Sequence, residues 1–100
     1  MSIEAEIQQR LERDFSPSYL HIENESYRHH VPAGSESHFK VAVVSEQFEG
    51  KRLLLRHKQV HACLVDLLSG PVHALALHTF TPQEWVSHQQ IPDSPNCRGS

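Results

Sequence analysis

The sequence predicts a small α+β domain, in which a mixed sheet of three strands is packed by helices. The chain has 100 residues, a length that suits one domain rather than two. Segments with helical spacing of apolar residues alternate with short apolar strands in the order α-β-β-α-β-α. The first two strands should pair antiparallel, whereas the β-α-β unit after them requires a parallel pair and a right-handed crossover.

The first helix is predicted over residues 3–14, where apolar residues recur at every fourth position. This stripe consists of Ile3, Ile7 and Leu11. Ser2 is a suitable N-cap, and Pro17 ends the helix. Residues 19–24 alternate between apolar and polar side chains and predict the first strand.

A long polar loop is predicted over residues 25–37, which lack periodicity and contain proline and glycine. Loops of this length in compact domains are often functional. The second strand is predicted over residues 38–45, with Phe39, Val41 and Val43 facing inward.

The longest helix is predicted over residues 52–68, after a turn at residues 48–50. Its apolar stripe consists of Leu53, Val60, Leu64, Leu67 and Leu68. The Gly-Pro pair at residues 70–71 ends this helix. Residues 72–79 are largely apolar on both faces, a pattern that predicts a third strand in a covered position of the sheet.

The last helix is predicted from a capping box, in which Thr81 is the N-cap and Glu84 completes the box. Trp85 should anchor this short helix to the body of the domain. Residues 1–90 therefore form the expected domain. Residues 91–100 have two prolines and no apolar pattern, and they predict a flexible tail.

Composition excludes several classes of protein. Twelve acidic and nine basic residues give a formal net charge of −3, unlike a strongly basic nucleic-acid coat. No apolar run approaches the roughly 18 residues of a membrane helix, and the N-terminus does not resemble a secretory signal. Two cysteines are too few for a disulfide scaffold, so a reducing cytoplasm is expected.

Enzyme motifs are also missing from the sequence, including nucleophile elbows, phosphate-binding glycine loops and zinc-protease signatures. Cys63 lies among apolar helix positions and is expected to be a buried packing thiol. Cys97 lies in the tail with nothing near it that would tune a nucleophile. We therefore expect a protein that is not an enzyme.

Nine histidines are the unusual feature of the composition. His73 stands at the start of the predicted third strand, just after Gly-Pro, and could project from the end of the sheet. The loop could bring His29 or His30 to meet it. Two histidines make a poor complete metal site but a suitable half-site, if a partner supplies the other ligands. Ordinary solvated histidines are the alternative.

A basic segment covers residues 51–61. Two of its histidines lie four positions apart, a spacing that can chelate a metal, but the neighbouring cations would repel the ion. The segment could contact phosphates with modest, salt-sensitive affinity, or it could be a solvated helix face. The candidate nucleic-acid contacts are Lys51, Arg52, Arg56, His57, Lys58 and His61.

Four stretches of the sequence carry a resemblance to a known family. They read ESYRHHVPAGSESHFKVAVVS at 25–45, FEGKRLLLRH at 48–57, VHALALHTFTPQEW at 72–85 and CRGS at 97–100. With these stretches in this order, the chain resembles the BolA family, most closely its bacterial members of the histidine-loop type. The resemblance implies an α+β fold similar to a class II KH domain. The GxxG loop that clamps nucleic-acid backbone in KH domains is absent, so KH-like RNA recognition is not carried over.

The resemblance implies a pairing with a monothiol glutaredoxin and a shared 2Fe–2S cluster. The cluster would be held by the glutaredoxin cysteine, a glutathione thiol and two histidines of this chain. The implied ligands are His73 and, before Val-Pro in the loop, His30, with His29 as the alternative. No cluster is expected in the isolated protein, which should be a monomer or a weak homodimer.

The resemblance also implies control of transcription in stress, cell shape and biofilm formation. Promoter DNA would be bound by the region that matches residues 48–61. The two roles are compatible, because a docked glutaredoxin could cover or expose the basic segment. Two hypotheses therefore follow from the sequence. The protein is either an interaction module that supplies half of a cluster site or a DNA-binding regulator.

Overall fold

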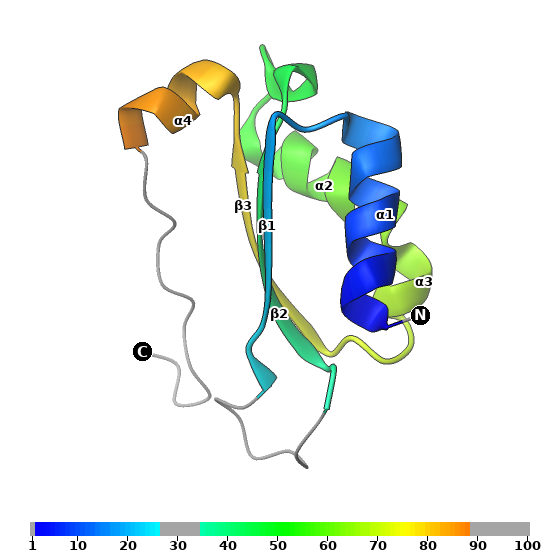
Figure 1. Ribbon diagram of the computed structural model, residues 1–100. Coiled ribbons are helices and arrows are strands. Elements are labelled where there is room, and N and C mark those ends of the chain that lie inside the picture. The colour runs from blue at the N-terminus through cyan, green and yellow to red at the C-terminus, as the bar shows by residue number, and fades with distance from the viewer. Residues whose placement is uncertain (1, 27–34, 89–100) are drawn as a thin grey trace.

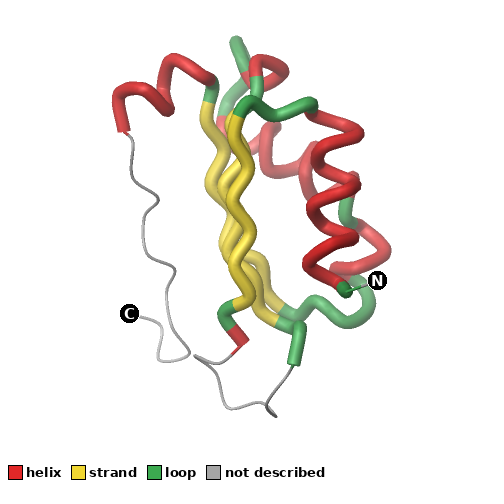
Figure 2. The backbone as a smooth tube through the Cα atoms, in the orientation of Figure 1, coloured by secondary structure: helices red, strands yellow, loops and turns green. Residues whose placement is uncertain are grey.

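The computed structural model describes residues 2–26 and 35–88, which form one sheet and its packed helices (Figures 1 and 2). The segment 27–34 and the predicted tail at 91–100 lie outside the described residues. The elements in chain order are α1 (Ile3–Phe15), β1 (Tyr19–Asn24), β2 (His38–Val44), the short 3-10 helix η2 (Glu46–Phe48), α2 (Leu53–Cys63), α3 (Val65–Leu68), β3 (Ala74–Phe80) and α4 (Pro82–His88).

The sheet has the predicted mixed topology, with strand order β1-β2-β3. β1 pairs antiparallel with β2, and Ile22 lies opposite Val41. β2 pairs parallel with β3, and Val41 lies opposite Leu77. The covered position belongs to β2, whose residues are nearly all buried, whereas β3 lies at an edge. The prediction of a covered third strand was therefore wrong: at the edge of the sheet most β3 residues are half-buried, and only Leu77 and Thr79 are buried.

The hydrophobic core lies between the sheet and the layer of α1, α2 and α3, which cover one face together (Figure 2). The predicted inward residues of β2 all belong to this core. Each fully buried aliphatic or aromatic side chain contributes about 1.5–3 kcal/mol relative to an exposed one. The core consists of Ile7, Leu11, Phe15, Phe39, Val41, Val43, Phe48, Val60, Leu64, Leu67, Val72 and Leu77.

Helix α1 begins at the predicted residue and ends one residue later than predicted. The Ser2 hydroxyl accepts a hydrogen bond from the Ala5 N–H at 3.1 Å, which satisfies one of the free donors of the first turn. The helix ends at Phe15, because Ser16 adopts the left-handed region at φ 43°.

The single helix predicted over residues 52–68 is two helices, α2 and α3. Leu64 joins them with φ −108° and ψ 16°, outside helical geometry. Its side chain is nevertheless buried in the core, as is that of Leu67. The apolar periodicity therefore continues across the break and gave no sign of it. Leu53, expected in the core, is 60% exposed because it stands at the first position of α2.

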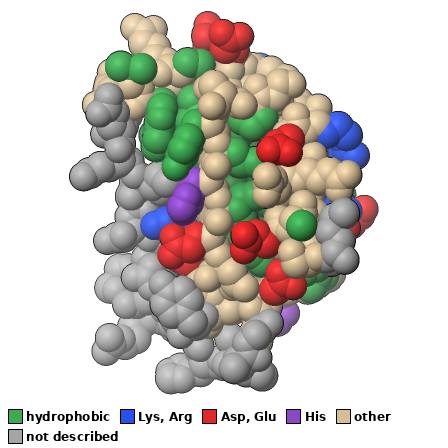
Figure 3. All heavy atoms as spheres, viewed as in Figure 1, with side chains coloured by type: hydrophobic (Ala, Val, Ile, Leu, Met, Phe, Trp, Pro, Cys, Tyr) green, Lys and Arg blue, Asp and Glu red, His purple; other side chains and the backbone are tan. Residues whose placement is uncertain are grey.

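Helix α4 lies on the other side of the sheet from α1 and α2 (Figure 1). Its capping box is confirmed: the Thr81 N–H donates to Glu84 Oε1 at 2.9 Å, and the Glu84 N–H donates to Thr81 Oγ1 at 3.1 Å. The Trp85 ring stacks on Tyr19 with centroids 4.8 Å apart, and it lies 5.2 Å from Phe80. Hydrophobic side chains gather next to α4 in Figure 3. Trp85 thus anchors α4, as predicted.

None of the helices in the described residues is both long and apolar enough to cross a membrane.

Candidate functional site

The predicted site residues lie at opposite ends of the sheet. His73 immediately precedes β3, at the end where β2 begins. The basic segment follows the other end of β2 and forms the start of α2. We call the first group, Ser37, His38 and His73, the histidine end. We call the second group, Lys51, Arg52 and Lys58, the basic end.

At the histidine end, the backbone of His73 is fixed while its side chain is exposed. The His73 N–H donates to the Ser37 carbonyl at 2.8 Å, and β3 itself begins two residues later than predicted. The His73 and His38 rings meet edge to face with centroids 6.3 Å apart. His38 Nδ1 lies 2.8 Å from the Ser37 hydroxyl. Two imidazoles therefore lie side by side at this end of the sheet.

Hydrogen bonds join the residues on either side of the segment 27–34, next to His73. We call these residues, Asn24, Ser26, Ser35, Ser37 and His38, the stem. The buried Ser26 hydroxyl accepts from the N–H groups of Ser37 and His38 at 3.0 and 3.1 Å. Asn24 Nδ2 donates to the Ser35 carbonyl at 2.9 Å. His29 and His30 belong to the segment itself and lie outside the described residues. Ser26 and Ser37, on either side of the segment that carries them, are therefore bonded to each other and, through the Ser37 carbonyl, to His73.

The stem also reaches α1 through Glu36. Its carboxylate oxygens accept from the N–H groups of Ile3 and Glu4, each at 3.3 Å, at the positive start of the helix. Glu36, Ser26 and Asn24 were not predicted from the sequence. A polar loop of this length offered no signal for which of its side chains would close it.

A complete metal site is absent from the described residues, where no three histidine, cysteine, aspartate or glutamate side chains come together. Imidazole nitrogen suits iron, and two imidazoles provide half of a ligand set. Cys63 does not extend this set. Burial, followed by the proximity of the Asp14 carboxylate, raises the pKa of the Cys63 thiol to about 12, so it is protonated at neutral pH. Cys63 packs against the core as expected, but it is half-buried rather than buried, and its Sγ donates to the Arg10 carbonyl at 3.5 Å.

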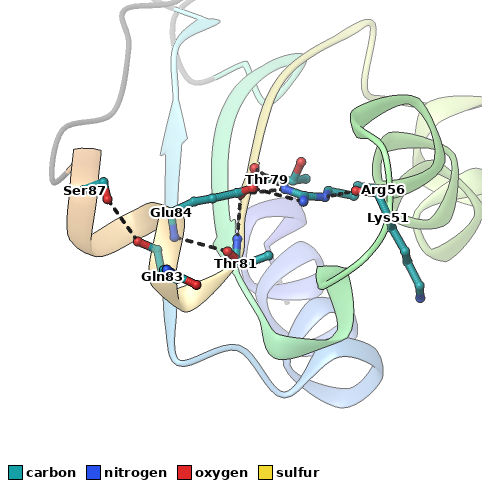
Figure 4. Close-up of polar contacts among 7 residues, drawn as sticks. All are labelled: Lys51, Arg56, Thr79, Thr81, Gln83, Glu84 and Ser87. Carbon is teal, nitrogen blue, oxygen red and sulfur yellow. Dashed lines mark hydrogen bonds and ion pairs between the residues drawn. The ribbon is translucent and has the colours of Figure 1, made fainter.

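At the basic end, Arg52 and Lys58 are exposed and Lys51 is half-buried. Lys51 and Arg52 precede α2 instead of occupying its first turn, and Arg52 is the N-cap residue. The Lys51 side chain points away from the contacts that join α2 to α4 (Figure 4). These three are the lysine and arginine residues of the predicted basic face that are not buried, and Lys51 Nζ also donates to Gln59 Oε1 at 3.4 Å.

Arg56 does not belong to that face, although the sequence analysis placed it there. It is 6% exposed, and its guanidinium holds the Glu84 carboxylate with two bonds of 2.7 and 3.2 Å (Figure 4). Its Nε donates to the Lys51 carbonyl at 2.8 Å. Arg56 therefore joins α2 to α4. One signal could have revealed this role, because Arg56 lies four positions before Val60 and so on the buried stripe of the helix.

Of the two histidines in the basic segment, His57 adds little positive charge. His57 is half-buried, whereas His61 is exposed. Burial, followed by the nearby His61 and Arg56, lowers the pKa of His57 below its ordinary value of 6.5. His57 is therefore neutral at pH 7, and phosphate attraction at this end depends on the lysines and Arg52.

A third polar group, missed from the sequence, lies on the sheet face opposite α1 and α2. Lys40 and Glu25 are both buried there, with Lys40 Nζ 4.0 Å from Glu25 Oε2. His78 Nε2 is buried without a hydrogen-bond partner among the described residues. Burial, then the charge of Lys40 and the proximity of His57, lowers the pKa of His78, and Glu25 opposes this shift.

Comparisons with known proteins agree with this architecture. The family model described as BolA-like protein matches residues 11–84. The chain is 50% identical over 101 aligned residues to the DNA-binding transcriptional regulator BolA of Escherichia coli (strain K12), covering 100% of this chain and 96% of that protein. It is 52% identical to BolA-like protein 1 of Homo sapiens, covering 97% of this chain and 71% of that protein.

Solved structures give the same result. The solution structure of BolA1 protein from Mus musculus superposes with a TM-score of 0.85 at 50% identity, covering 97% of this chain and 79% of that chain. BolA1 from Arabidopsis thaliana superposes with a TM-score of 0.78 at 36% identity, covering 84% of this chain and 96% of that one. The predicted α+β fold is thereby confirmed, and the chain belongs to the BolA-like protein family.

Proposed function

We propose that this protein is a regulatory partner of a monothiol glutaredoxin, and that it supplies two imidazole ligands to a shared 2Fe–2S cluster. The ligands would be His73 and, from the segment 27–34, His30, with His29 as the alternative. The observation that carries the proposal is the position of His73. Its backbone is bonded to Ser37 at the stem of that segment, and its side chain is exposed.

The donor set fits such a half-site. Glutathione and the glutaredoxin cysteine would supply the other two ligands. A cluster with two imidazoles on one iron has a higher reduction potential than an all-cysteine cluster. Each imidazole must be unprotonated to bind iron, so assembly should weaken towards acid pH. This role suits the reducing cytoplasm, where glutathione is available.

The test is visible circular dichroism of the protein mixed with a monothiol glutaredoxin, glutathione, iron and sulfide in the absence of oxygen. A spectrum different from that of the glutaredoxin homodimer is expected, and His73→Ala should abolish it. His30→Ala should weaken or alter it, unless His29 substitutes. His61→Ala is the matched control, because His61 is an exposed histidine on α2. An unchanged spectrum in the His30→Ala/His73→Ala double variant would contradict the ligand assignment.

A second candidate role is DNA-binding regulation of stress, cell-shape and biofilm genes. It is favoured by the 50% identical relative that is named a DNA-binding transcriptional regulator, and by the exposed cations of the basic end. Three phosphate contacts predict modest affinity, with log K falling against log[salt] at a slope of about −3.

Binding of promoter DNA across salt concentrations tests this role. The triple variant Lys51→Gln/Arg52→Gln/Lys58→Gln should lose binding. Arg13→Gln removes an exposed cation from α1 and should bind like the wild type. If the triple variant retains full affinity, DNA does not bind through the basic end.

A further inference from the structure

Three consecutive leucines are exposed in the first turn of α2. Leu53, Leu54 and Leu55 are 60%, 68% and 45% exposed. We call these three residues the leucine patch. Consecutive helix positions differ by 100° around the axis, so these side chains surround the end of the helix instead of facing the core. Contiguous exposed apolar surface is unusual on a soluble domain and marks an interaction site. Neither role proposed above uses it.

The leucine patch lies among positive charges and beside two hollows. One hollow of about 270 Å³ is lined by Gly50, Lys51, Arg52, Leu54, Leu55 and Lys58. The other, of about 450 Å³, is lined by Lys51, Arg52, Leu53, Arg56, Thr79, Phe80 and Glu84. Both include Lys51 and Arg52, so each hollow combines leucine surface with cationic side chains. The first turn of α2 has no acidic residue, and the Glu84 carboxylate in the second hollow is paired with Arg56.

We propose that the leucine patch binds an acidic amphipathic helix of another protein. Apolar side chains of that helix, such as leucine, would enter the hollow beside Leu54 and Leu55. Carboxylates on either side of them would pair with the cations of the basic end. Such a ligand matches both the apolar and the charged parts of the surface.

Two other occupants fit less well. A symmetric dimer through the leucine patch would bring the basic ends of two copies together, and like charges would oppose it. A DNA backbone would pair with Lys51, Arg52 and Lys58, but its phosphates offer no apolar surface to the leucines. The charge and the apolar area together therefore favour an acidic protein helix.

The leucine patch and the histidine end lie at opposite ends of the sheet, since α2 begins after the end of β2 and His73 precedes β3. A helix bound at the leucine patch would therefore leave His73 accessible. The inference stands independently of the cluster-ligand proposal.

The probe is a fluorescein-labelled synthetic helix of about 18 residues, or five turns, with leucines at i, i+4 and i+7 between glutamates. Fluorescence anisotropy with the full chain should show saturable binding. Leu54→Ser and Leu55→Ser should each weaken it about tenfold, and Lys58→Glu severalfold. Val65→Ser is the matched control, because Val65 is 56% exposed on α3 and should not affect binding. His73→Ala should leave it unchanged.

Three outcomes would overturn the proposal. The first is absence of binding by the acidic helix. The second is equal binding of a peptide whose leucines are replaced by serine, which would reduce the contact to charge alone. The third is that Leu54→Ser abolishes self-association or lowers DNA affinity and leaves peptide binding intact, which would assign the surface to a second copy or to DNA. Circular dichroism of each variant checks that the fold is retained.

Discussion

The two ends of the sheet use their polar residues in opposite ways. Next to α4, Arg56 is buried and bonded to the Glu84 carboxylate and to the Lys51 carbonyl. At the histidine end, the bond from His73 to Ser37 joins backbone atoms only, and the His73 side chain is exposed. Arg56 and His73 are both residues that the sequence made candidates for contact with a partner. Arg56 joins two helices, whereas the His73 side chain is accessible to a partner.

Removal of Arg56 should have the largest effect on stability. Arg56→Ala leaves the Lys51 carbonyl and the buried Thr79 carbonyl without their donor, and it separates α4 from α2. Breaking a buried pair costs about 3–5 kcal/mol. The Glu84 side chain is 43% exposed and can be solvated, so we expect a loss of about 3 kcal/mol in the free energy of unfolding, measured by urea denaturation.

Lys58→Ala is the control at the same end, because Lys58 is exposed on the same helix. It should change the free energy of unfolding by at most about 0.5 kcal/mol. If the Arg56→Ala and Lys58→Ala variants are equally stable, the distinction between a structural arginine and available cations is wrong.

A substitution in the stem should cause the next largest loss in the free energy of unfolding. Ser26→Ala removes the hydroxyl that accepts from Ser37 and His38, and leaves two N–H groups without an acceptor. We expect a loss of about 2 kcal/mol, because an unsatisfied buried donor costs about 1–3 kcal/mol. Amide hydrogen exchange should become faster at Ser37 and His38. Unchanged protection there would argue that the stem does not depend on this hydroxyl.

A smaller effect is expected on the pH dependence of the free energy of unfolding. It involves His78 in β3, the strand that runs between the two ends. Its pKa in the folded protein lies below the ordinary value of 6.5 because of burial, Lys40 and His57. Below that value the unfolded chain binds more protons than the folded one, so stability should fall as the pH is lowered. The same sign applies to His57.

His78→Gln removes one of these titrations. The free energy of unfolding, measured from about pH 7 to about pH 5, should then fall less steeply than in the wild type. An identical slope in both proteins would show that His78 has the same proton affinity in the folded and unfolded states.

The smallest stability effect is expected at His73 itself. His73→Ala keeps the backbone bond to Ser37 and removes only an exposed ring, so the free energy of unfolding should change by at most about 0.5 kcal/mol. Thermal or urea denaturation checks this. A loss as large as that of Ser26→Ala would assign His73 a structural role and remove the contrast between the two ends.

Local signals account for the parts of the fold that the sequence predicted well. The capping box at Thr81 involves residues three positions apart, and the alternation in residues 38–45 directly identifies the inward face of β2. The bend at Leu64 was missed because both sides of it keep the apolar stripe. Long-range contacts were missed for a different reason. Glu84 lies 28 positions after Arg56, and no local pattern relates the two.

The parallel pairing of β2 and β3 has a consequence for folding. The β1–β2 pair can form between neighbouring segments, whereas β3 can join only after α2 and α3 have been traversed. Non-local pairing of this kind slows folding and leaves a strand edge open to other chains. During synthesis, β2 would have an unpaired edge until Phe80 has left the ribosome, and Arg56 would lack its carboxylate until Glu84 follows. We therefore expect aggregation during folding to begin at β2, the strand that is best protected in the finished protein.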